Sequence, residues 1–477
     1  MNNFEISTLD KSAIDHTFAS QKAQALKLRK STCAQRLEVL ARFEKVFKAS
    51  YAKMYAAAAA DFGKPEAEVD MGEIMVVVSD LAHIRKHLKK WMKATPVRAS
   101  LSMLGTSSKI IVEPKGTSLV ISPWNYPFNL TFGPMMSAIA AGNTVIIKPS
   151  EMTPHMSKVI SEIVAEAFSP EEVALFEGTA EVSTYLTSLP FDHIFFTGSP
   201  AVGKLVMAAA AKNLTSVTLE LGGKSPVIVD KTANIAKAAR SIAFGKFSNN
   251  GQTCIAPDYL YVDEAVKDML IAELKTYIGR QYGLDEEALA NDDYCQIANA
   301  AHHGRISGLL SDALAQGGQL ITGGQVDDQQ CSIAPTLVEG MSADSRIMQE
   351  EIFGPLLPIL TYTDLDTVLD HINSQPKPLA LYFYSSDKRA IDKVLTETSA
   401  GGTCINQSVM HFVHPNLPFG GVNNSGIGMS GGEWGFKAFS HERSVLEDRW
   451  SSIHMMHPPY TPKVKKLIKM AVSFLGR

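Results

Sequence analysis

The chain of 477 residues is too long for one hydrophobic core, since cores stop growing at roughly 250 to 300 residues, so we expect two or three domains. Hydrophobic residues make up 45% and charged residues 20%, a composition that excludes a mainly disordered or collagen-like chain. The formal net charge of −4 provides no basic field for phosphate backbones, which argues against nucleic acid as a partner and favours a small-molecule ligand.

Five cysteines are present, with no paired spacing and no Cys-x-x-Cys motif: Cys33, Cys254, Cys295, Cys331 and Cys404. Neither a disulfide framework nor a metal site is therefore expected. The first 18 residues lack the basic start and apolar run of a signal peptide, which favours a cytoplasmic location. The apolar segments fall short of the roughly 20 residues that span a bilayer, so we expect no transmembrane helix.

The first 96 residues predict two long helices. An amphipathic pattern over 32–60 begins with a capping box of Thr32 and Gln35. A second helical pattern covers about 66–93. Residues 97–114 then alternate with the period of a strand around a Gly-containing turn. We expect them and the Gly- and Asn-rich segment LPFGGVNNSGIG (417–428) to form a separate hairpin element.

From residue 117 onward, short strands rich in Val, Ile and Phe alternate with helices, which is typical of a parallel sheet covered on both faces. The expected strands lie at 117–122, 143–150, 173–178 and 193–198, and the expected helices at 127–141, 154–167, 180–188 and 200–212. Thr153-Pro154 and Ser199-Pro200 each pair a capping hydroxyl with a proline at the first helical position. The segment 215–230 leads into a second α/β unit that runs to about residue 410.

Cys254 lies in the turn-forming stretch SNNGQTCIAP (248–257), directly after an apolar helical segment. The preceding Asn250 and Gly251 permit tight backbone geometry and the close approach of a ligand. A substrate could reach a thiol in this setting. From Cys254 alone, however, a small buried hydrophobe explains the residue equally well.

Glu220 stands in the otherwise apolar strand VTLELGG. Burial without a partner would raise the pKa of this carboxyl group and make it a usable base near neutral pH. The alternative is a glutamate at a strand end that pairs with Lys224 or faces solvent. For Glu220 taken alone, this structural explanation is slightly favoured.

Other polar residues follow the carboxyl ends of the predicted strands, where open parallel sheets bind their ligands. Asn125 could donate to an oxyanion, a contribution of about 2.7 to 4 kcal/mol, or form an Asx turn. Lys148 and Glu151 could hold the hydroxyls of a ribose, and the backbone at Gly198 and Ser199 could hold a pyrophosphate. The glycine spacing at this break does not match the G-x-G-x-x-G fingerprint.

Seven motifs, in the order PWNYP, KPSE, FFTGS, ELGGKSP, GQTC, EEIFGP and LPFGGVNNSGIG, resemble the NAD(P)-dependent aldehyde dehydrogenase superfamily over nearly the whole chain. The segments CIAPDY and HPPY and the short N-terminus are similar to the class 3 branch, and to bacterial coniferyl aldehyde dehydrogenases in particular. The resemblance implies an α/β homodimer. Its implied parts are a Rossmann-like parallel-sheet cofactor domain (1–96 and 115–221), an α/β catalytic domain (222–410), a small β oligomerisation element (97–114 and 411–445) and a C-terminal tail (446–477).

The resemblance also implies roles for single residues: Cys254 as the nucleophile, Glu220 as the general base and Asn125 as the oxyanion donor. The implied cofactor contacts are Lys148, Glu151, Gly198 and Ser199 on the adenosine side, and Glu351 and Phe353 on the nicotinamide side. The implied reaction is attack of the thiolate on an aldehyde, transfer of hydride to NAD or NADP, and hydrolysis of the resulting thioester to a carboxylic acid.

Two other functions remain open at this stage. A CoA-acylating relative would pass the acyl group to a thiol, but that branch generally lacks a base at the position of Glu220. A catalytically silent binding or structural member would not need the intact set of candidate residues. Glu151 favours NAD over NADP because its carboxylate repels a 2′-phosphate, which Lys148 could offset.

Aromatic residues indicate the substrate class, and basic residues indicate where the C-terminal tail lies. Residues expected at the substrate entrance are Tyr126, Phe128, His411 and Phe412, which would suit an aromatic or medium-chain apolar aldehyde. The tail TPKVKKLIKMAVSFLGR combines four lysines with an apolar face. We expect a helix that packs on the body or on a partner subunit, with a membrane surface as the alternative.

Overall fold

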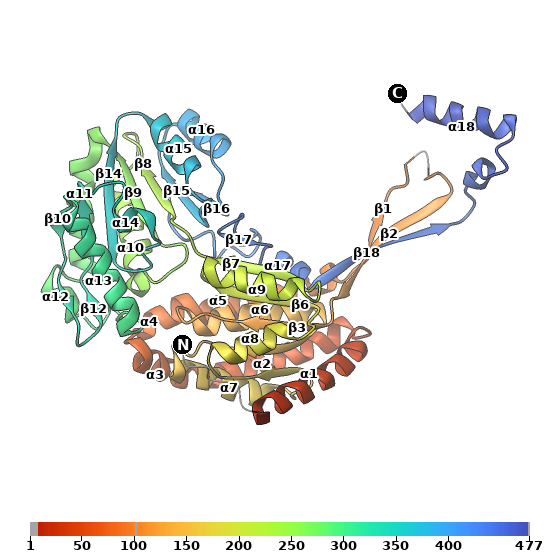
Figure 1. Ribbon diagram of the computed structural model, residues 1–477, viewed down its shortest axis with the longest axis horizontal. Helices are drawn as coiled ribbons and strands as arrows, with labels where there is room; N and C mark the ends of the chain where they lie inside the picture. Colours follow the sequence, from red (N-terminus) through yellow and green to blue (C-terminus); the bar gives the residue numbers. More distant parts are fainter. Residues whose placement is uncertain (1–7, 101–102, 476–477) are drawn as a thin grey trace.

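The computed structural model describes residues 8–100 and 103–475 (Figure 1). The signal-peptide expectation for the N-terminus therefore rests in part on residues outside the described ones. At the centre of the first half lies a six-stranded sheet in the order β17-β7-β6-β3-β4-β5. Its strands are β3 (Thr117–Ile121), β4 (Thr144–Lys148), β5 (Val173–Leu175), β6 (His193–Gly198), β7 (Ser216–Leu221) and β17 (Gly426–Ile427). All except β17 run parallel, as the alternating pattern predicts.

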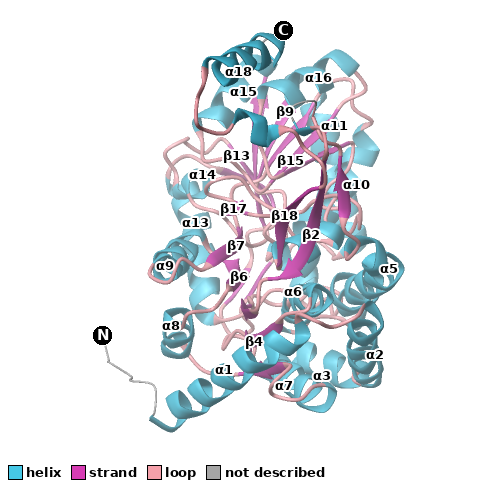
Figure 2. Ribbon diagram, turned by 90° about the vertical axis from the view of Figure 1, so that its right-hand side faces the viewer, coloured by secondary structure: helices cyan, strands magenta, loops and turns pink. Residues whose placement is uncertain are grey.

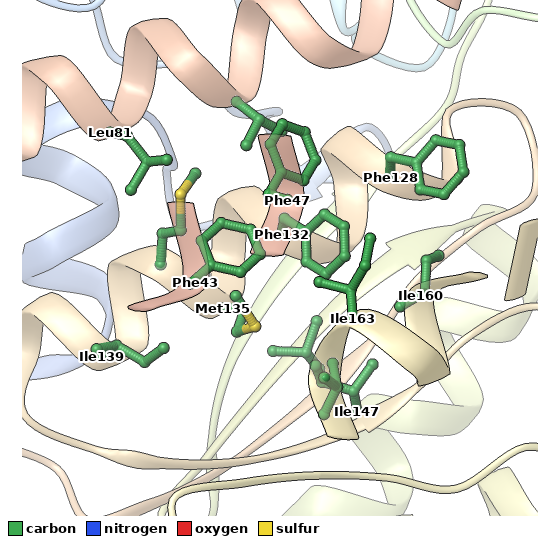
Figure 3. Close-up of a cluster of buried hydrophobic side chains, with 14 of the residues drawn as sticks. Phe43, Phe47, Leu81, Phe128, Phe132, Met135, Ile139, Ile147, Ile160 and Ile163 are labelled. Atoms are coloured by element: carbon green, nitrogen blue, oxygen red, sulfur yellow. The ribbon is translucent and has the colours of Figure 1, made fainter. Parts of the chain in front are cut away.

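Helices cover both faces of this sheet, because successive strand residues point to opposite sides and both sides are apolar. On one face pack helices α2 (Cys33–Ala49), α3 (Tyr51–Phe62), α5 (Met75–Trp91), α6 (Pro127–Ala141) and α7 (Pro154–Ala167), around the buried side chains of Figure 3. On the other face pack α1 (Thr8–Leu28), α8 (Ala180–Ser188) and α9 (Pro200–Ala211). The predicted doubly wound layout is confirmed.

The predicted helix over 32–60 is wrong in one respect. The chain bends at Ser50 (φ −98°, ψ 0°), so that α2 and α3 are separate helices. Ser50 donates its hydroxyl to the carbonyl oxygen of Val46, which offers the backbone a local alternative to the continuous helix. The second predicted helix is present as α4 (Glu66–Val69), a π-turn (Asp70–Ile74) and α5.

The second half of the chain builds a seven-stranded sheet in the order β10-β13-β14-β9-β8-β15-β16, parallel except for β10. Its strands are β8 (Pro226–Val229), β9 (Tyr259–Asp263), β10 (Gln319–Thr322), β13 (Thr336–Glu339), β14 (Leu356–Tyr362), β15 (Ala380–Tyr384) and β16 (Gly402–Ile405). The helices of this half are α10 (Ile235–Phe247), α11 (Lys267–Gln281), α12 (Glu286–Leu289), α13 (Ala300–Ala315), α14 (Arg346–Gln349), α15 (Leu365–Ser374) and α16 (Lys388–Glu397). Single turns at Ser248–Gly251 and Glu264–Val266 and a short pair, β11 (Val326–Asp327) and β12 (Ser332–Ile333), complete it.

A three-stranded antiparallel sheet projects from the body as an arm (Figures 1 and 2). It consists of β1 (Thr95–Val97), β2 (Thr106–Pro114) and β18 (Ser440–Asp448), in the order β1-β2-β18. The hairpin expected near 97–114 is thus present, although residues 101–102 at its turn lie outside the described ones. The segment 417–428 does not join it, because β17 pairs with β7 instead. The division into domains stays a prediction.

The tail follows the arm away from the body. After β18 come a single turn (Ile453–Met456) and helix α18 (Pro462–Leu475), which has no buried residue and contacts that turn. In Figure 1, α18 lies at the upper right, beyond the end of the arm and clear of the body. The expectation that the tail packs on the body of its own chain is therefore wrong, since β18 carries it outward. Across residues 8–100 and 103–475, no helix is long and apolar enough to cross a membrane.

Two of the three predicted helix caps are confirmed. The Thr32 hydroxyl accepts the N–H of Gln35, whose side chain accepts the N–H of Thr32, which completes the capping box. Ser199 accepts the N–H of Val202 at the start of α9. Thr153 makes no such bond at the start of α7, and its buried hydroxyl has no partner within the described part of the chain.

Asp61, at the end of α3, caps α7 in place of Thr153. Its carboxylate accepts the N–H groups of His155 at 3.1 Å and Met156 at 2.9 Å, and it contacts the His155 ring at 2.7 Å. The Asp61 side chain is only 1% exposed. A negative charge at this place also suits the positive end of the helix dipole.

We expect Asp61→Ala to lower the free energy of unfolding by about 1 to 2 kcal/mol, because it leaves the first N–H groups of α7 without an acceptor. Thr153→Val is the matched control, since it removes only a buried hydroxyl without a partner and should leave stability unchanged or higher. The midpoint of thermal unfolding checks both variants. Equal losses in the two variants would contradict the assignment of the cap.

Candidate active site

Cys254 follows a sharply bent loop. After α10 ends at Phe247, three consecutive residues have left-handed backbone: Asn249 (φ 53°), Asn250 (φ 55°) and Gly251 (φ 71°). Asn and Gly are the residues that adopt this conformation at least cost. At Gly251 a Cβ atom would also lie 2.3 Å from the carbonyl oxygen of Gly354, so no other residue fits. The loop leaves Cys254 partly exposed rather than sealed in the core.

Side-chain hydrogen bonds fix this loop in place. Gln252 donates to the carbonyl oxygens of Asn249 and Gln296, each at 3.0 Å, and accepts the N–H of Ala298 at 2.9 Å. Asn250 donates to the carbonyl oxygen of Cys295 at 2.6 Å. Because Gln252 and Asn250 are both buried, these bonds are shielded from competing water.

Asn125 reaches the same loop from the end of β3. Its amide nitrogen donates to the carbonyl oxygen of Gln252 at 2.9 Å, and its own carbonyl oxygen accepts from the Asn249 amide at 3.1 Å. A primary amide carries two N–H donors, and this bond uses one of them.

Glu220 lies near the end of β7 and is buried. One carboxylate oxygen accepts the hydroxyl of Ser430 at 2.8 Å, and the other is buried without a partner among the described residues. Burial raises the pKa of Glu220 to about 8, and the Ser430 bond opposes this effect. Residues that follow β17, which pairs with β7 opposite Glu220, bring Ser430 into contact. The carboxyl group therefore exchanges protons near neutral pH and has a free oxygen to do so.

Two acids act on the pKa of Cys254. Burial, and to a lesser extent the carboxylates of Glu351 and Glu220, raise the pKa of this thiol to about 12. In the unliganded protein Cys254 is therefore a thiol at neutral pH, and it needs a base or a nearby positive charge to become a nucleophile.

Glu351 and Phe353 lie on the opposite side of the Gly-Gly break. Glu351 accepts the N–H of Gly223 at 3.0 Å, and burial raises its pKa to about 7. A Cβ at Gly222 would lie 2.4 Å from the Glu351 carboxylate, so only glycine admits this contact. Phe353, with a φ of 48°, packs edge-on against Trp124, which directly precedes Asn125. Phe353 thus lies beside the segment of Asn125, and Glu351 beside the Gly-Gly break after β7.

The remaining predicted contacts lie at the carboxyl ends of β4 and β6, which flank β3 in the sheet. Lys148 is buried and donates to Glu151 at 2.9 Å, while Glu151 keeps 47% of its side chain exposed. Gly198 ends β6 and Ser199 begins α9. A partly free carboxylate and a helix N-terminus at the same sheet edge fit the ribose and the pyrophosphate of a dinucleotide.

The expectation for the substrate entrance is partly wrong. Phe128 is fully buried in the core of Figure 3 and cannot line an entrance. Tyr126 points toward the loop, with its hydroxyl 3.0 Å from that of Thr253. His411 and Phe412 are partly buried and pack with Phe419, which belongs to the apolar cluster against which Cys254 also packs.

Sequence reasoning missed several residues that hold the candidate site together. The structure adds Ser430, Gln252, Lys64, Glu68 and Glu73. Gln252 stands in the GQTC motif and could have been found there. The other four carry no local signal, because their partners lie far away in the sequence.

Comparison with known proteins gives the family. The aldehyde dehydrogenase family profile matches residues 3–445. Three relatives are similar over most of their length. The chain is 45% identical over 433 residues to a 4,4'-diaponeurosporen-aldehyde dehydrogenase of Staphylococcus aureus, which covers 90% of this chain and 93% of that protein. It is 41% identical over 429 residues to a dimeric NADP-preferring aldehyde dehydrogenase of Rattus norvegicus (90% and 92%). It is 38% identical over 457 residues to a probable coniferyl aldehyde dehydrogenase of Pseudomonas aeruginosa (95% of each).

Among solved structures, a substrate-bound AldH of Staphylococcus aureus has a TM-score of 0.91 and 43% identity, covering 96% of this chain and 99% of that one. Relatives named as coniferyl aldehyde dehydrogenases and as members of aldehyde dehydrogenase family 3 confirm the class 3-like resemblance. The chain therefore belongs to the aldehyde dehydrogenase family, and it oxidises an aldehyde to the carboxylic acid with NAD or NADP.

Proposed function

We propose that Cys254 is the nucleophile of this reaction, Glu220 the general base and Asn125 the oxyanion donor. The support for the proposal is that all three residues are linked. Asn125 is hydrogen-bonded to the loop of Cys254, and Glu220 lies close enough for its charge to affect the pKa of the thiol. The free oxygen of Glu220 and the second N–H of Asn125 supply the two functions that acyl chemistry at a sulfur atom needs.

The chemistry follows from these groups. The proton of the Cys254 thiol passes to the Glu220 carboxylate and on to solvent, the sulfur bonds to the aldehyde carbon, and the carbonyl oxygen gains the negative charge. The amide of Asn125 and the backbone N–H of Cys254 donate to that oxygen. A nicotinamide held near Glu351 and Phe353 would supply the oxidant that takes the hydride from the aldehyde carbon. A thioester on Cys254 remains. Glu220 then takes a proton from a water molecule, which attacks the thioester and releases the acid.

Glu220 also argues for water as the final acceptor. Transfer of the acyl group to a thiol, as in CoA-acylating enzymes, does not need a carboxylate base beside the thioester. Here the carboxyl group is buried, keeps one oxygen without a partner and has a pKa raised to about 8. These properties suit proton transfer from water near neutral pH.

For the cofactor, we propose that Lys148 and Glu151 contact the adenosine ribose and that α9 binds the pyrophosphate through Gly198 and Ser199. Glu351 and Phe353 would hold the nicotinamide side. The exposed carboxylate of Glu151 favours the free 2′-hydroxyl of NAD. A relative is named NADP-preferring, and Lys148 beside Glu151 offsets the repulsion of a 2′-phosphate only in part, so we expect NAD to be used first. Values of kcat/KM with each cofactor test this order, which a strong NADP preference would reverse.

For the substrate, we propose an aromatic or medium-chain apolar aldehyde. The support is the partly buried group of His411, Phe412 and Phe419, the last of which belongs to the apolar cluster against which Cys254 also packs. The names of two relatives refer to coniferyl and diaponeurosporen aldehydes. Comparison of kcat/KM over aromatic and aliphatic aldehydes checks the substrate class, and a preference for small polar aldehydes would exclude it.

We further propose a homodimer in which the projecting arm (β1, β2 and β18) contacts the partner subunit. The arm and the tail expose large apolar side chains, among them Leu446, Trp450 and Phe474. Exposed patches of this kind mark interaction surfaces. A relative is named dimeric. Sedimentation velocity of the full chain would show the mass of two copies, and a monomer at micromolar concentration would exclude this assembly.

Loss of the proposed nucleophile should abolish turnover. We expect Cys254→Ala to reduce aldehyde oxidation by more than about 1,000-fold, because no other group can form the thioester. Binding of NAD, measured by fluorescence quenching, should stay within about threefold. Cys33→Ala, at the partly buried start of α2, is the control and should retain full activity. Turnover that survives in Cys254→Ala would remove this residue from the mechanism.

A further prediction concerns pH. The base must be a carboxylate, and the pKa of Glu220 is raised to about 8, so steady-state turnover should rise with pH around this value and be lost as the pH falls below it. Ser430→Ala removes a hydrogen bond that favours the carboxylate, so the rise should move to higher pH. Ser430→Thr keeps the hydroxyl and serves as the control.

Replacement of Glu220 by Gln removes the base itself. In Glu220→Gln we expect an initial burst of reduced cofactor followed by a slow steady state without this pH dependence. A steady state equal to that of the unmodified enzyme would mean that another group activates the water.

A further inference from the structure

A buried ionic cluster lies directly behind the proposed catalytic residues. Its centre is Lys64, in the loop between α3 and α4, whose side chain is fully buried. The Lys64 ammonium lies 3.3 Å from a carboxylate oxygen of Glu73 and 3.3 Å from the backbone carbonyl oxygen of Asn125. A lysine thus contacts the residue proposed to hold the oxyanion.

Glu73 ties this lysine to the segment that carries Asn125. It lies in the π-turn at Asp70–Ile74, where one extra residue enters the helix; such turns recur at functional sites. One oxygen of Glu73 faces Lys64, and the other accepts the N–H of Asn129 at 2.9 Å in the first turn of α6. Glu73 therefore caps the helix that starts directly after Asn125.

Glu68 ties the same cluster to the loop of the nucleophile. Both of its oxygens accept the N–H of Asn249, at 3.1 and 2.9 Å, and Asn249 is the first left-handed residue of that loop. Burial raises the pKa of Glu68, and the positive charge of Lys64 opposes this effect. The charge of Lys64 thus favours the ionised form of a carboxylate that accepts a backbone N–H.

A third connection runs through Tyr126. The Lys64 ammonium lies 4.0 Å from the centre of the Tyr126 ring, which is a cation–π distance. The hydroxyl of Tyr126 lies 3.0 Å from that of Thr253, the residue before Cys254. The ammonium group therefore contacts the backbone of Asn125 directly and is connected through Tyr126 to Thr253, next to Cys254.

Stability alone does not account for such a cluster. The desolvation of buried charges often cancels their attraction, so that apolar residues of the same size would stabilise a fold equally well. In this cluster the outer oxygens of both glutamates accept backbone N–H groups of the catalytic segments. The charges therefore fix the relative position of two segments that are far apart in the sequence.

We propose that Lys64 is a positioning residue, which sets the distance between the Asn125 amide and the Cys254 sulfur through its contacts with Glu73, the Asn125 backbone and the Tyr126 ring. Glu68 of the same cluster holds the N–H of Asn249. The inference rests on the proposed roles of Asn125 and Cys254. It predicts that loss of Lys64 lowers kcat without weakening the binding of either substrate, because misplacement of a catalytic group by about 1 Å can cost roughly 100-fold in rate.

The test is the double variant Lys64→Met/Glu68→Gln. In the unmodified protein one lysine and two glutamates give the cluster one net negative charge. The double variant leaves Glu73 alone and therefore keeps that net charge, so no added charge is buried. We expect kcat to fall by about 10- to 100-fold, with KM for the aldehyde and the dissociation constant of NAD within about threefold. Lys64→Arg keeps the positive charge and should recover a large part of kcat. A folded double variant with kcat within threefold of the unmodified enzyme would overturn the proposal.

A double-mutant cycle shows whether Lys64 acts through Asn125. Asn125→Ala alone should lower kcat by about 100- to 1,000-fold. In that background the double variant should lower kcat by less than about threefold more, because there is no longer an amide to position. A full and independent loss would mean a general structural effect and would also overturn the proposal.

Two controls complete the experiment. Phe43→Leu, in the core of Figure 3, destabilises the same half of the molecule without touching the cluster and should leave kcat unchanged. If the double variant does not fold, Glu68→Gln alone decides the question, since Gln keeps one oxygen for the N–H of Asn249. A lowered kcat at unchanged KM supports the proposal. An unchanged kcat overturns it. Cys254→Ala separates the role of Lys64 from the proposed catalytic roles, because turnover in that variant would exclude Cys254 as the nucleophile.

Discussion

The hydrogen bond from the Asn125 amide to the carbonyl oxygen of Gln252 joins two segments that are 127 residues apart. One segment leaves the six-stranded sheet, and the other leads into the seven-stranded sheet. Most of the site depends on this junction, because a nucleophile and an oxyanion donor must be held within a few tenths of an ångström. The left-handed residues at 249–251 and the buried bonds of Gln252 serve the same end.

Burial sets the chemistry of the site as much as geometry does. It raises the pKa of Cys254, Glu220 and Glu351 alike, because each would otherwise carry a negative charge in a region of low dielectric constant. The hydrogen bonds differ, however. Glu351 is tied to the backbone at Gly223, whereas Glu220 has one bond to a hydroxyl and one oxygen without a partner. The carboxyl groups of Glu351 and Glu220 therefore differ in their hydrogen bonds, and only Glu220 keeps a buried oxygen without a partner among the described residues.

Strands β17 and β18 lie close together in the sequence but run to different parts of the molecule. β17 returns to the first sheet and brings Ser430 to Glu220, while β18 leaves along β2 and carries α18 away from the body. The segment from β17 to the end of β18 (426–448) thus links the surroundings of Glu220 to the projecting arm. The arm has the exposed apolar surface of an interface.

The sequence alone determined the features that depend on neighbouring residues. The alternation of strands and helices, the bounds of α6 and α7, the capping box at Thr32 and the bend at Cys254 all follow from residues a few positions apart, so short-range sterics and hydrogen bonding suffice to predict them. Ordered motifs further allowed Cys254, Glu220 and Asn125 to be named together.

Only the tertiary structure decided the features that depend on distant partners. Asp61 rather than Thr153 caps α7, Phe128 belongs to the core, Ser430 holds Glu220, and Lys64 joins the segments of Asn125 and Cys254. No local pattern encodes these contacts, because burial and the pairing of charges arise only when remote parts of the chain pack together.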